Sequence, residues 1–375
     1  MKKFVSIILA LVLPLLAQAQ AVLSFNEPAR DETEALPLGD TFGKALVYGG
    51  VTDDVIHLDY GDIHIRQAFA CDTVTSYERR LDVTKALASM DMGTKDGGMF
   101  SRKYFMSRTS RAMVIRLRSW EEGALNFRVQ VDSTWVGAQV DSLSEEQFAV
   151  SGLSESGRPY RYLVHLVSCD GLYDTDPCLA VSDATEATII IMSAPEEYML
   201  KAQRQSYRAL LEEHVRDMAE RLAKTSLEVK GRDEDLLRFH FERYLQDSGY
   251  AVTGVHPLVD GRSFGIAETG EMLVHSDGGE MLLLPSLPKA WADGSVKGLA
   301  VDGGHMVDID WQAGALERAI IRCGGSRCVL RTPRPVVVAR SGRGRPVSSH
   351  MDRIGDWYVT EVTAHTGDVL LVVSN

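Results

Sequence analysis

One stretch of ten residues, HPLVDGRSFG at positions 256–265, contains the side chains that could do chemistry. Its last five residues match the Gly-x-Ser-x-Gly pattern of serine hydrolases, in which Ser263 would attack an acyl carbon. The same stretch places a carboxylate, Asp260, on an Asp-Gly turn behind a His-Pro pair. A carboxylate held in such a turn could take up a proton from an attacking water. The sequence therefore offers two candidate reactive groups, a hydroxyl and a carboxylate.

The surroundings of Ser263 do not favour a serine nucleophile. That chemistry needs a strand, a sharp turn and a helix inside an alternating α/β sheet, and it needs a histidine base. The flanking sequence here predicts an antiparallel β protein with few helices. His275, His305 and His350 could each act as the base, and nothing singles one out. Serine hydrolysis therefore ranks below chemistry at Asp260.

Composition excludes several other classes of function. The net charge of −12 argues against nonspecific binding to nucleic acid. The chain has no dinucleotide fingerprint, no Walker loop and no His-Glu-x-x-His pair. The spacing of its five cysteines does not resemble a zinc site. We therefore expect no cofactor and no metal.

The first 21 residues have the pattern of a secretory signal peptide. Two lysines precede an apolar run from Phe4 to Leu16, and small residues follow it. The run is too short to span a membrane as a helix. Cleavage is expected after Ala19 or Ala21. We therefore expect an exported protein, periplasmic or extracellular, that keeps no membrane span after cleavage.

An exported chain meets oxidising conditions, so its cysteines could pair. Cys323 and Cys328 flank a predicted hairpin tip, with their thiols opposite each other. Cys169 and Cys178 could close a second local loop, which would leave Cys71 over. Plain burial of the thiols is the alternative.

Hydrophobic patterning divides the remaining chain into four parts. Residues 22–194 contain many short alternating runs, such as LNFRVQVDS, which predict an antiparallel β-sandwich. Residues 195–249 have helical spacing and predict a connector, with one helix to about residue 224 and another over about 233–246. Residues 250–280 hold the His-Pro loop and a short helix, and 281–375 predict a small β-domain. The fold class expected is mainly β with a helical segment, α+β.

At this point a family resemblance is visible. The block EMLLLPSLPKAWADGSVKGLAVDGGHMVDIDWQAGAL, residues 280–316, resembles glycoside hydrolase family 95, the inverting α-L-fucosidases. EALPLGDTFGKALVYGGV (34–51) and YERRLDVTKA (77–86) are similar to motifs near the start of that family. So are FSRKYFMS (100–107), with lysine where glutamate is usual, and FHFERYL (239–245), with glutamate in place of glycine.

The resemblance assigns roles to the His-Pro loop. The family's aspartate on this loop activates or positions the attacking water, so Asp260 inherits that role. His256 would contact the sugar. Trp291 is a second candidate for substrate binding, with Trp311 beside it, although aromatic residues at these spacings more often belong to the core. Ser263 stands where the family has asparagine. The implied substrate is a fucosylated glycan.

The chain departs from the family in the catalytic middle. Family members carry an α/α barrel of about a dozen helices there, which needs roughly 250 residues. Here only residues 246–255 separate the FHFERYL motif from the His-Pro loop, so 250–280 is a remnant of that barrel. The barrel's general-acid glutamate and its asparagine pair have no counterpart. Glu268 or Glu271 could be recruited as the acid, although solvent-facing charges are the simpler interpretation.

Three functions follow in order. The leading hypothesis is an exported glycoside hydrolase homologue that resembles α-L-fucosidases and acts on fucosylated glycans. The alternative is a non-catalytic glycan-binding or structural remnant of that family. Serine hydrolysis through Ser263 is third.

Overall fold

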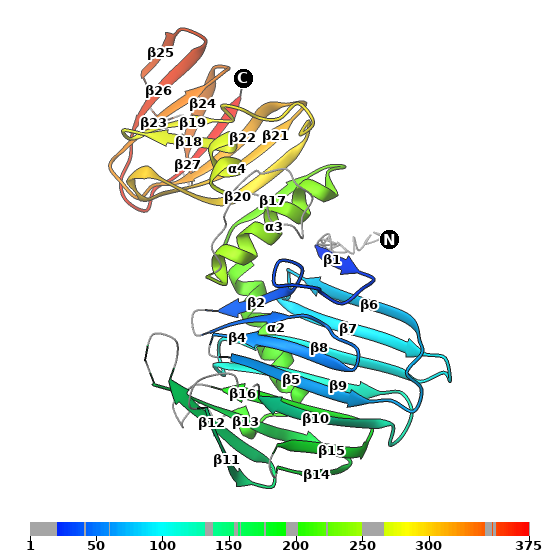
Figure 1. Ribbon diagram of the computed structural model, residues 1–375. Coiled ribbons are helices and arrows are strands. Elements are labelled where there is room, and N and C mark those ends of the chain that lie inside the picture. Colours follow the sequence, from blue (N-terminus) through cyan, green and yellow to red (C-terminus); the bar gives the residue numbers. More distant parts are fainter. Residues whose placement is uncertain are drawn as a thin grey trace, which may run out of the picture.

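The computed structural model describes residues 21–40, 43–59, 61–131, 138–153, 157, 159–175, 178–192, 202–222, 224–249, 266–341, 347 and 350–374. Strands dominate these residues and helices are few, so the predicted class, mainly β with a helical segment, is confirmed. Figure 1 shows two β-sandwiches with helix α3 (Asp233–Asp247) between them. Within the described residues, no helix is long and apolar enough to cross a membrane.

Two antiparallel sheets form the N-terminal sandwich. In spatial order, the first sheet holds β1 (Val22–Phe25), β6 (Val74–Asp82), β7 (Leu87–Thr94), β8 (Met99–Ser107), β9 (Ala112–Ser119), β16 (Glu186–Met192), β13 (Pro159–Cys169), β12 (Gln147–Leu153) and β11 (Gln139–Ser144). The second holds β14 (Leu172–Asp174), β15 (Leu179–Ala184), β10 (Leu125–Val131), β5 (Gly61–Ala68), β4 (Asp53–Leu58), β3 (Gly43–Val47) and β2 (Leu36–Asp40). Alternate side chains of both sheets meet in one hydrophobic core, as expected for facing sheets.

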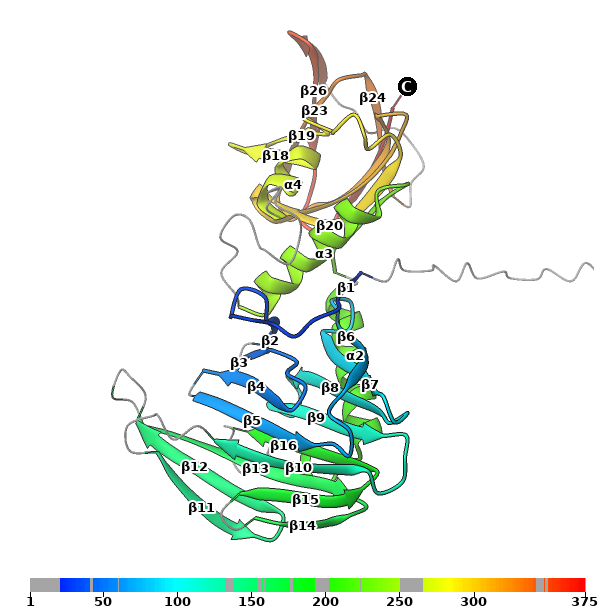
Figure 2. The same ribbon diagram turned by 45° about the vertical axis from the view of Figure 1, so that its right-hand side comes forward.

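Helix α2 (Tyr207–Leu222) lies against the outer face of the first sheet (Figures 1 and 2). Leu210 of the helix packs with Phe105, Val114 and Ile190 of the sheet. His214 is also buried here, and its Nε2–H donates to the Lys85 carbonyl at 2.8 Å. Desolvation lowers the pKa of His214, so the ring is a neutral core group.

In the described part of the chain, the first connector helix, which was predicted to end at about residue 224, begins later than expected. Residues 202 and 203 are helical, but a turn separates them from α2. Ser206 caps the new helix, because its hydroxyl accepts a hydrogen bond from the Ala209 N–H at 3.3 Å. Serine satisfies the free N–H groups of a helix start, and the hydrophobic periodicity alone did not reveal this break.

Helix α3 (Asp233–Asp247) confirms the second helix predicted in the connector, and it packs on both sandwiches. Phe241, Tyr244 and Leu245 belong to the core of the N-terminal sandwich. Leu236 and Phe239 belong to the core of the C-terminal sandwich. One short helix therefore buries opposite sides in two separate cores.

The C-terminal sandwich also has two sheets. One contains β17 (Ser226–Val229), β20 (Gly294–Val301), β21 (His305–Gln312), β22 (Ala315–Arg322), β27 (Val369–Ser374) and β24 (Val336–Arg340). The other contains β18 (Val274–Asp277), β19 (Glu280–Leu283), β23 (Arg327–Thr332), β26 (Trp357–Thr363) and β25 (His350–Ile354). Helix α4 (Ile266–Leu273) precedes β18, and the short 3₁₀ turn η1 (Asp302–Gly304) joins β20 to β21. Strand β17 was not predicted. It lies between the two connector helices in the chain, and it pairs with the edge of β20, which comes much later in the sequence.

The Cys323–Cys328 segment is a crossover between sheets, so its prediction as a hairpin tip was wrong. Cys323 follows β22 of one sheet, and Cys328 lies on β23 of the other. The two thiols nevertheless face each other in the core and share a hydrogen bond. All five cysteines carry free thiols in the structure. Burial raises the pKa of Cys328 to about 12, which suppresses the reactive thiolate once the domain has folded.

We predict that Cys323 and Cys328 form a disulfide in exported protein, while the chain is still folding and its thiols are accessible. Peptide mapping with and without reduction would detect the linked pair. Protein folded under reducing conditions should keep both thiols and resist a water-soluble alkylating reagent until it is unfolded. A bond between Cys169 and Cys178 with Cys323 and Cys328 left free would contradict this prediction.

Candidate functional site

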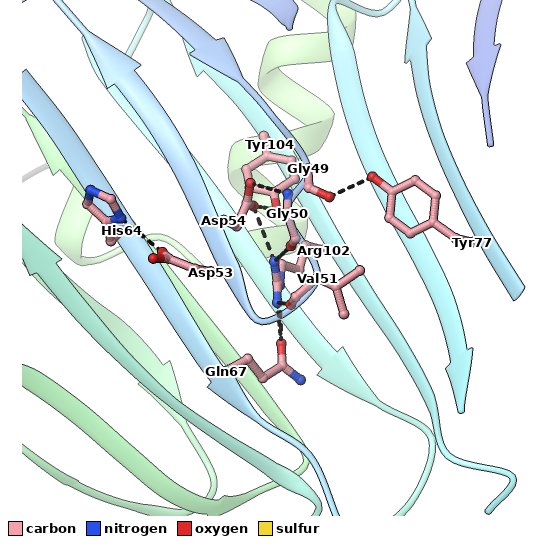
Figure 3. Close-up of polar contacts among 10 residues, drawn as sticks. All are labelled: Gly49, Gly50, Val51, Asp53, Asp54, His64, Gln67, Tyr77, Arg102 and Tyr104. Carbon is pink, nitrogen blue, oxygen red and sulfur yellow. Dashed lines mark hydrogen bonds and ion pairs between the residues drawn. The ribbon is translucent and has the colours of Figure 1, made fainter. Parts of the chain in front are cut away.

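A fully buried ion pair joins the two sheets of the N-terminal sandwich (Figure 3). Arg102 of β8 lies 3.3 Å from Asp54 of β4, measured from Nη1 to Oδ2, and both side chains are at most 1% exposed. Arg102 also donates to Gln67 Oε1 and to the carbonyls of Gly50 and Val51, both at 2.7 Å. The guanidinium nitrogens that donate these hydrogen bonds therefore all have their acceptors inside the sandwich.

Both oxygens of the Asp54 carboxylate accept hydrogen bonds. The Tyr104 hydroxyl donates to Oδ2, and the Gly50 N–H donates to Oδ1 at 3.0 Å. Burial raises the pKa of Asp54, and Arg102 and the hydrogen bonds oppose that rise. The Tyr77 hydroxyl donates to the Gly49 carbonyl at 2.6 Å and so fixes the same loop (Figure 3). Three of the motifs that carried the resemblance meet here, and their role is structural.

The FHFERYL motif joins the connector to the N-terminal sandwich. Arg243 of α3 donates to the carbonyls of Arg221, Leu222 and Thr225 at the end of α2. A cation at this end satisfies free carbonyls and complements the helix dipole. The Tyr244 hydroxyl donates to the Pro37 carbonyl of β2 at 2.7 Å. These contacts place α3 firmly against the first sandwich.

Trp291 joins helix α3 to the C-terminal sandwich. Its indole N–H donates to Asp235 of α3 at 2.9 Å, and its carbonyl accepts from the Trp311 indole N–H at 3.0 Å. Trp291 is 7% exposed and Trp311 is 2% exposed. A sugar-stacking platform needs an exposed ring face, which neither tryptophan presents in this structure. Their observed role is packing, the alternative to the predicted sugar contact of Trp291.

A cleft of about 640 Å³ lies where the end of α2, helix α3 and the sheet β17–β20–β21–β22 come together. Its polar lining includes His240, Asp293, Gln312 and Glu317, together with one row of four residues across the sheet. That row is Glu228, Ser295, Asp310 and Arg318, which are cross-strand neighbours in register. The cleft is therefore rich in carboxylates and sits between the two sandwiches.

The carboxylates of this row are suited to binding rather than to acid–base catalysis. Glu228 and Asp310 lie two strands apart, roughly 9.5 Å between backbones, beside the ~6.5–9.5 Å range of inverting glycosidases. However, Arg318 Nε holds Asp310 Oδ2 at 2.6 Å, and Glu228 is exposed to solvent. A general acid needs a sheltered carboxyl to keep its proton at neutral pH. Carboxylates and a guanidinium on an open surface can hydrogen-bond a hydroxyl-rich ligand.

The residues of the opening loop lie outside the described part of the chain. This holds for His256, Asp260 and Ser263, so their predicted roles stay predictions. The side chain of Glu268 is likewise not described. Glu271 is described; it is 59% exposed and accepts a hydrogen bond from His275. That exposed pair raises the pKa of His275 and leaves Glu271 in water, as expected for a surface charge.

Sequence reasoning missed the buried ion pair. The sequence did contain a signal for the pair, because Arg102 lies on the same face of its strand as Tyr104. A charged side chain on a face that is buried in the core requires a buried partner. It also missed the cleft, whose residues come from strands that pair only in the folded chain. Among the described residues, no group of three or more His, Cys, Asp or Glu side chains could hold a metal ion.

Comparisons with known proteins identify two domains of glycoside hydrolase type. Residues 57–199 match the N-terminal domain of glycosyl hydrolase family 65. Residues 275–366 match the C-terminal domain of glycoside hydrolase family 95. The second match covers the block that carried the resemblance, whereas the first names a different family from the one expected there. These two matches support a glycoside hydrolase-like protein and do not assign it to family 95 specifically.

A search of curated proteins gives no match. Among solved structures, the chain is similar to a putative kojibiose phosphorylase from the human microbiome, with 9% identity and a TM-score of 0.45. The match covers 62% of this chain and 42% of that structure, so this chain spans less than half of its length.

The buried ion pair yields a stability prediction. Replacing Arg102 by methionine leaves the buried Asp54 carboxyl without its cation, which we expect to lower the free energy of unfolding by about 3–5 kcal/mol. The matched control is Arg66→Met, which removes an exposed pair with Asp53 and should cost about 1 kcal/mol or less. Urea unfolding of both variants tests this, and equal losses would show that the buried pair has no special role.

Proposed function

We propose that this chain is an exported, fucosidase-like protein that recognises fucosylated glycans, with hydrolysis much slower than in enzymes that hold a complete carboxylate pair. The observation that carries the proposal is the family 95 match over residues 275–366, with the Asp260 loop just before it in the chain. The cleft beside α3, lined by carboxylates, Gln312 and Arg318, supports it as a surface for a hydroxyl-rich ligand.

The expected slowness follows from the chemistry of inversion. One carboxyl must protonate the leaving oxygen while a second group activates water on the opposite face of the sugar. Asp260 would supply the water-activating side. Of the two glutamates considered as the acid, Glu271 is exposed and already bonded to His275. A missing acid or base costs roughly 10²–10⁴ in rate, so recognition is the function that the chain supports best.

The proposal predicts binding of a 2-linked fucosyl oligosaccharide and slow release of L-fucose from it. Substituting Asp260→Asn should abolish the release and change affinity by less than about tenfold, because the amide keeps the shape of the carboxyl but cannot accept the proton. Calorimetry measures binding, and chromatography of released fucose measures turnover. Neither binding nor release by correctly folded protein would contradict the proposal.

The serine alternative is tested in the same preparation. Ser263→Ala should leave fucose release and glycan binding unchanged, because the hydroxyl has no part in the proposed reaction. If the wild type hydrolyses acyl esters and the Ser263→Ala variant does not, the chain is a serine hydrolase instead.

We also propose that the protein is exported, and the contacts of Ala21 predict which of the two cleavage sites is used. Ala21 is buried, and its carbonyl accepts a hydrogen bond from the Val83 N–H at 3.0 Å. Cleavage after Ala21 would remove this contact beside β1, whereas cleavage after Ala19 keeps it. We therefore predict that the mature protein begins at Gln20. Sequencing the N-terminus of protein recovered outside the cytoplasm tests this, and full-length protein confined to the cytoplasm would contradict export.

A further inference from the structure

A groove crosses the outer face of the second sheet of the N-terminal sandwich, where β5, β10, β15 and β14 lie side by side (Figure 2). Its volume is about 580 Å³, which is within the usual range of small-molecule sites, roughly 300–1,000 Å³. Short side chains, Ala68, Ala180 and Ser182, leave space above the middle strands. This groove is separate from the cleft beside α3 and shares no lining residue with it.

Two arginines stand directly opposite each other along one wall. Arg128 of β10 pairs in register with Arg66 of β5, and both side chains are exposed. Like charges placed opposite each other across strands destabilise a sheet. Asp53 compensates Arg66, with Nε and Oδ2 at 3.1 Å. In the described part of the chain, no carboxylate lies within ion-pair distance of Arg128, although the whole protein is acidic.

The rest of the groove combines polar and apolar groups with one carboxylate, Asp174, which lies two strands from Arg128 in the same cross-strand row. Asn126 uses its Oδ1 to accept the Asp183 N–H at 3.1 Å, so its amide NH₂ is the group left to donate to a ligand. Ser182 lies next to it on β15. Leu172 of β14 is 70% exposed and forms an apolar edge. Hydroxyl-binding groups beside an apolar surface match the two kinds of surface on a sugar ring.

We propose that this groove binds a saccharide that carries a carboxylate, a uronic acid-containing oligosaccharide, with Arg128 as the partner of the carboxylate. Arg128 is exposed and has no ion-pair partner among the described residues, so it can pair with an anion, and its planar guanidinium matches the two oxygens of a carboxylate. The saccharide class rests on the proposed glycan-directed function, whereas the anionic group rests on the geometry of the groove itself. The site would hold a glycan and would not cleave it.

The experiment measures affinity for oligogalacturonate and for the same oligosaccharide with its carboxylates reduced to neutral alcohols. The wild type should bind the acidic form, and rising salt should weaken that binding. Arg128→Gln should weaken it roughly tenfold or more, since hydrogen bonds between charged groups are the strong ones. Arg161→Gln is the matched control, because Arg161 is an exposed arginine on β13 of the other sheet. Thermal unfolding verifies that both variants fold.

Equal binding of the acidic and reduced oligosaccharides, unchanged affinity of Arg128→Gln, or no binding of oligogalacturonate would each overturn the proposal. So would tighter binding of a sulfated, carboxylate-free oligosaccharide. Binding of a neutral fucosyl oligosaccharide is measured in the same samples. If that binding persists while oligogalacturonate fails, the proposed function stands and the groove proposal falls.

Discussion

The pairing of Arg102 with Asp54 is the constraint on which the N-terminal sandwich depends. Neither charge can stay in a hydrophobic core alone, so each requires the other sheet to be in place. Arg102 also binds the Gly50 and Val51 carbonyls, which ties the loop before β4 to β8. A shift of β8 by one residue within its own sheet would turn Arg102 away from Asp54, so the pair is tied to the register of this strand.

Helix α3 connects the N-terminal sandwich to the C-terminal half of the chain. Tyr244 reaches β2 of one sandwich, and Asp235 receives the indole N–H of Trp291 from the other. Arg243 closes the end of α2 from the same helix. The residues that resemble fucosidase motifs are thus concentrated at joints of the fold.

Much of the fold followed from the sequence. Alternating runs such as LNFRVQVDS predicted the strands, and the spacing of apolar residues predicted α3. Other features depend on contacts that no local pattern contains. The start of α2 depends on the Ser206 cap, and β17 exists because β20 offers an unpaired edge. Cys323 and Cys328 are close in the chain, yet Cys323 follows a strand of one sheet and Cys328 lies on a strand of the other.

The site was less predictable than the fold, for a related reason. Trp291 has the aromatic character of a sugar platform, and only the fold shows that its ring is buried against α3. The cleft gathers Glu228, Asp310 and Arg318 from three strands, so chain position does not reveal their proximity. Motif resemblance did identify the kind of domain at the C-terminal end, because that block is long and contiguous.

We propose that these domains recognise a fucosylated glycan at the junction of the two sandwiches. The most direct measurement is a crystal structure of the mature protein with a 2-linked fucosyl oligosaccharide. We expect the fucosyl ring in the cleft beside α3, within reach of Asp310 and Arg318. A ligand ordered elsewhere, with that cleft empty, would contradict recognition at this junction.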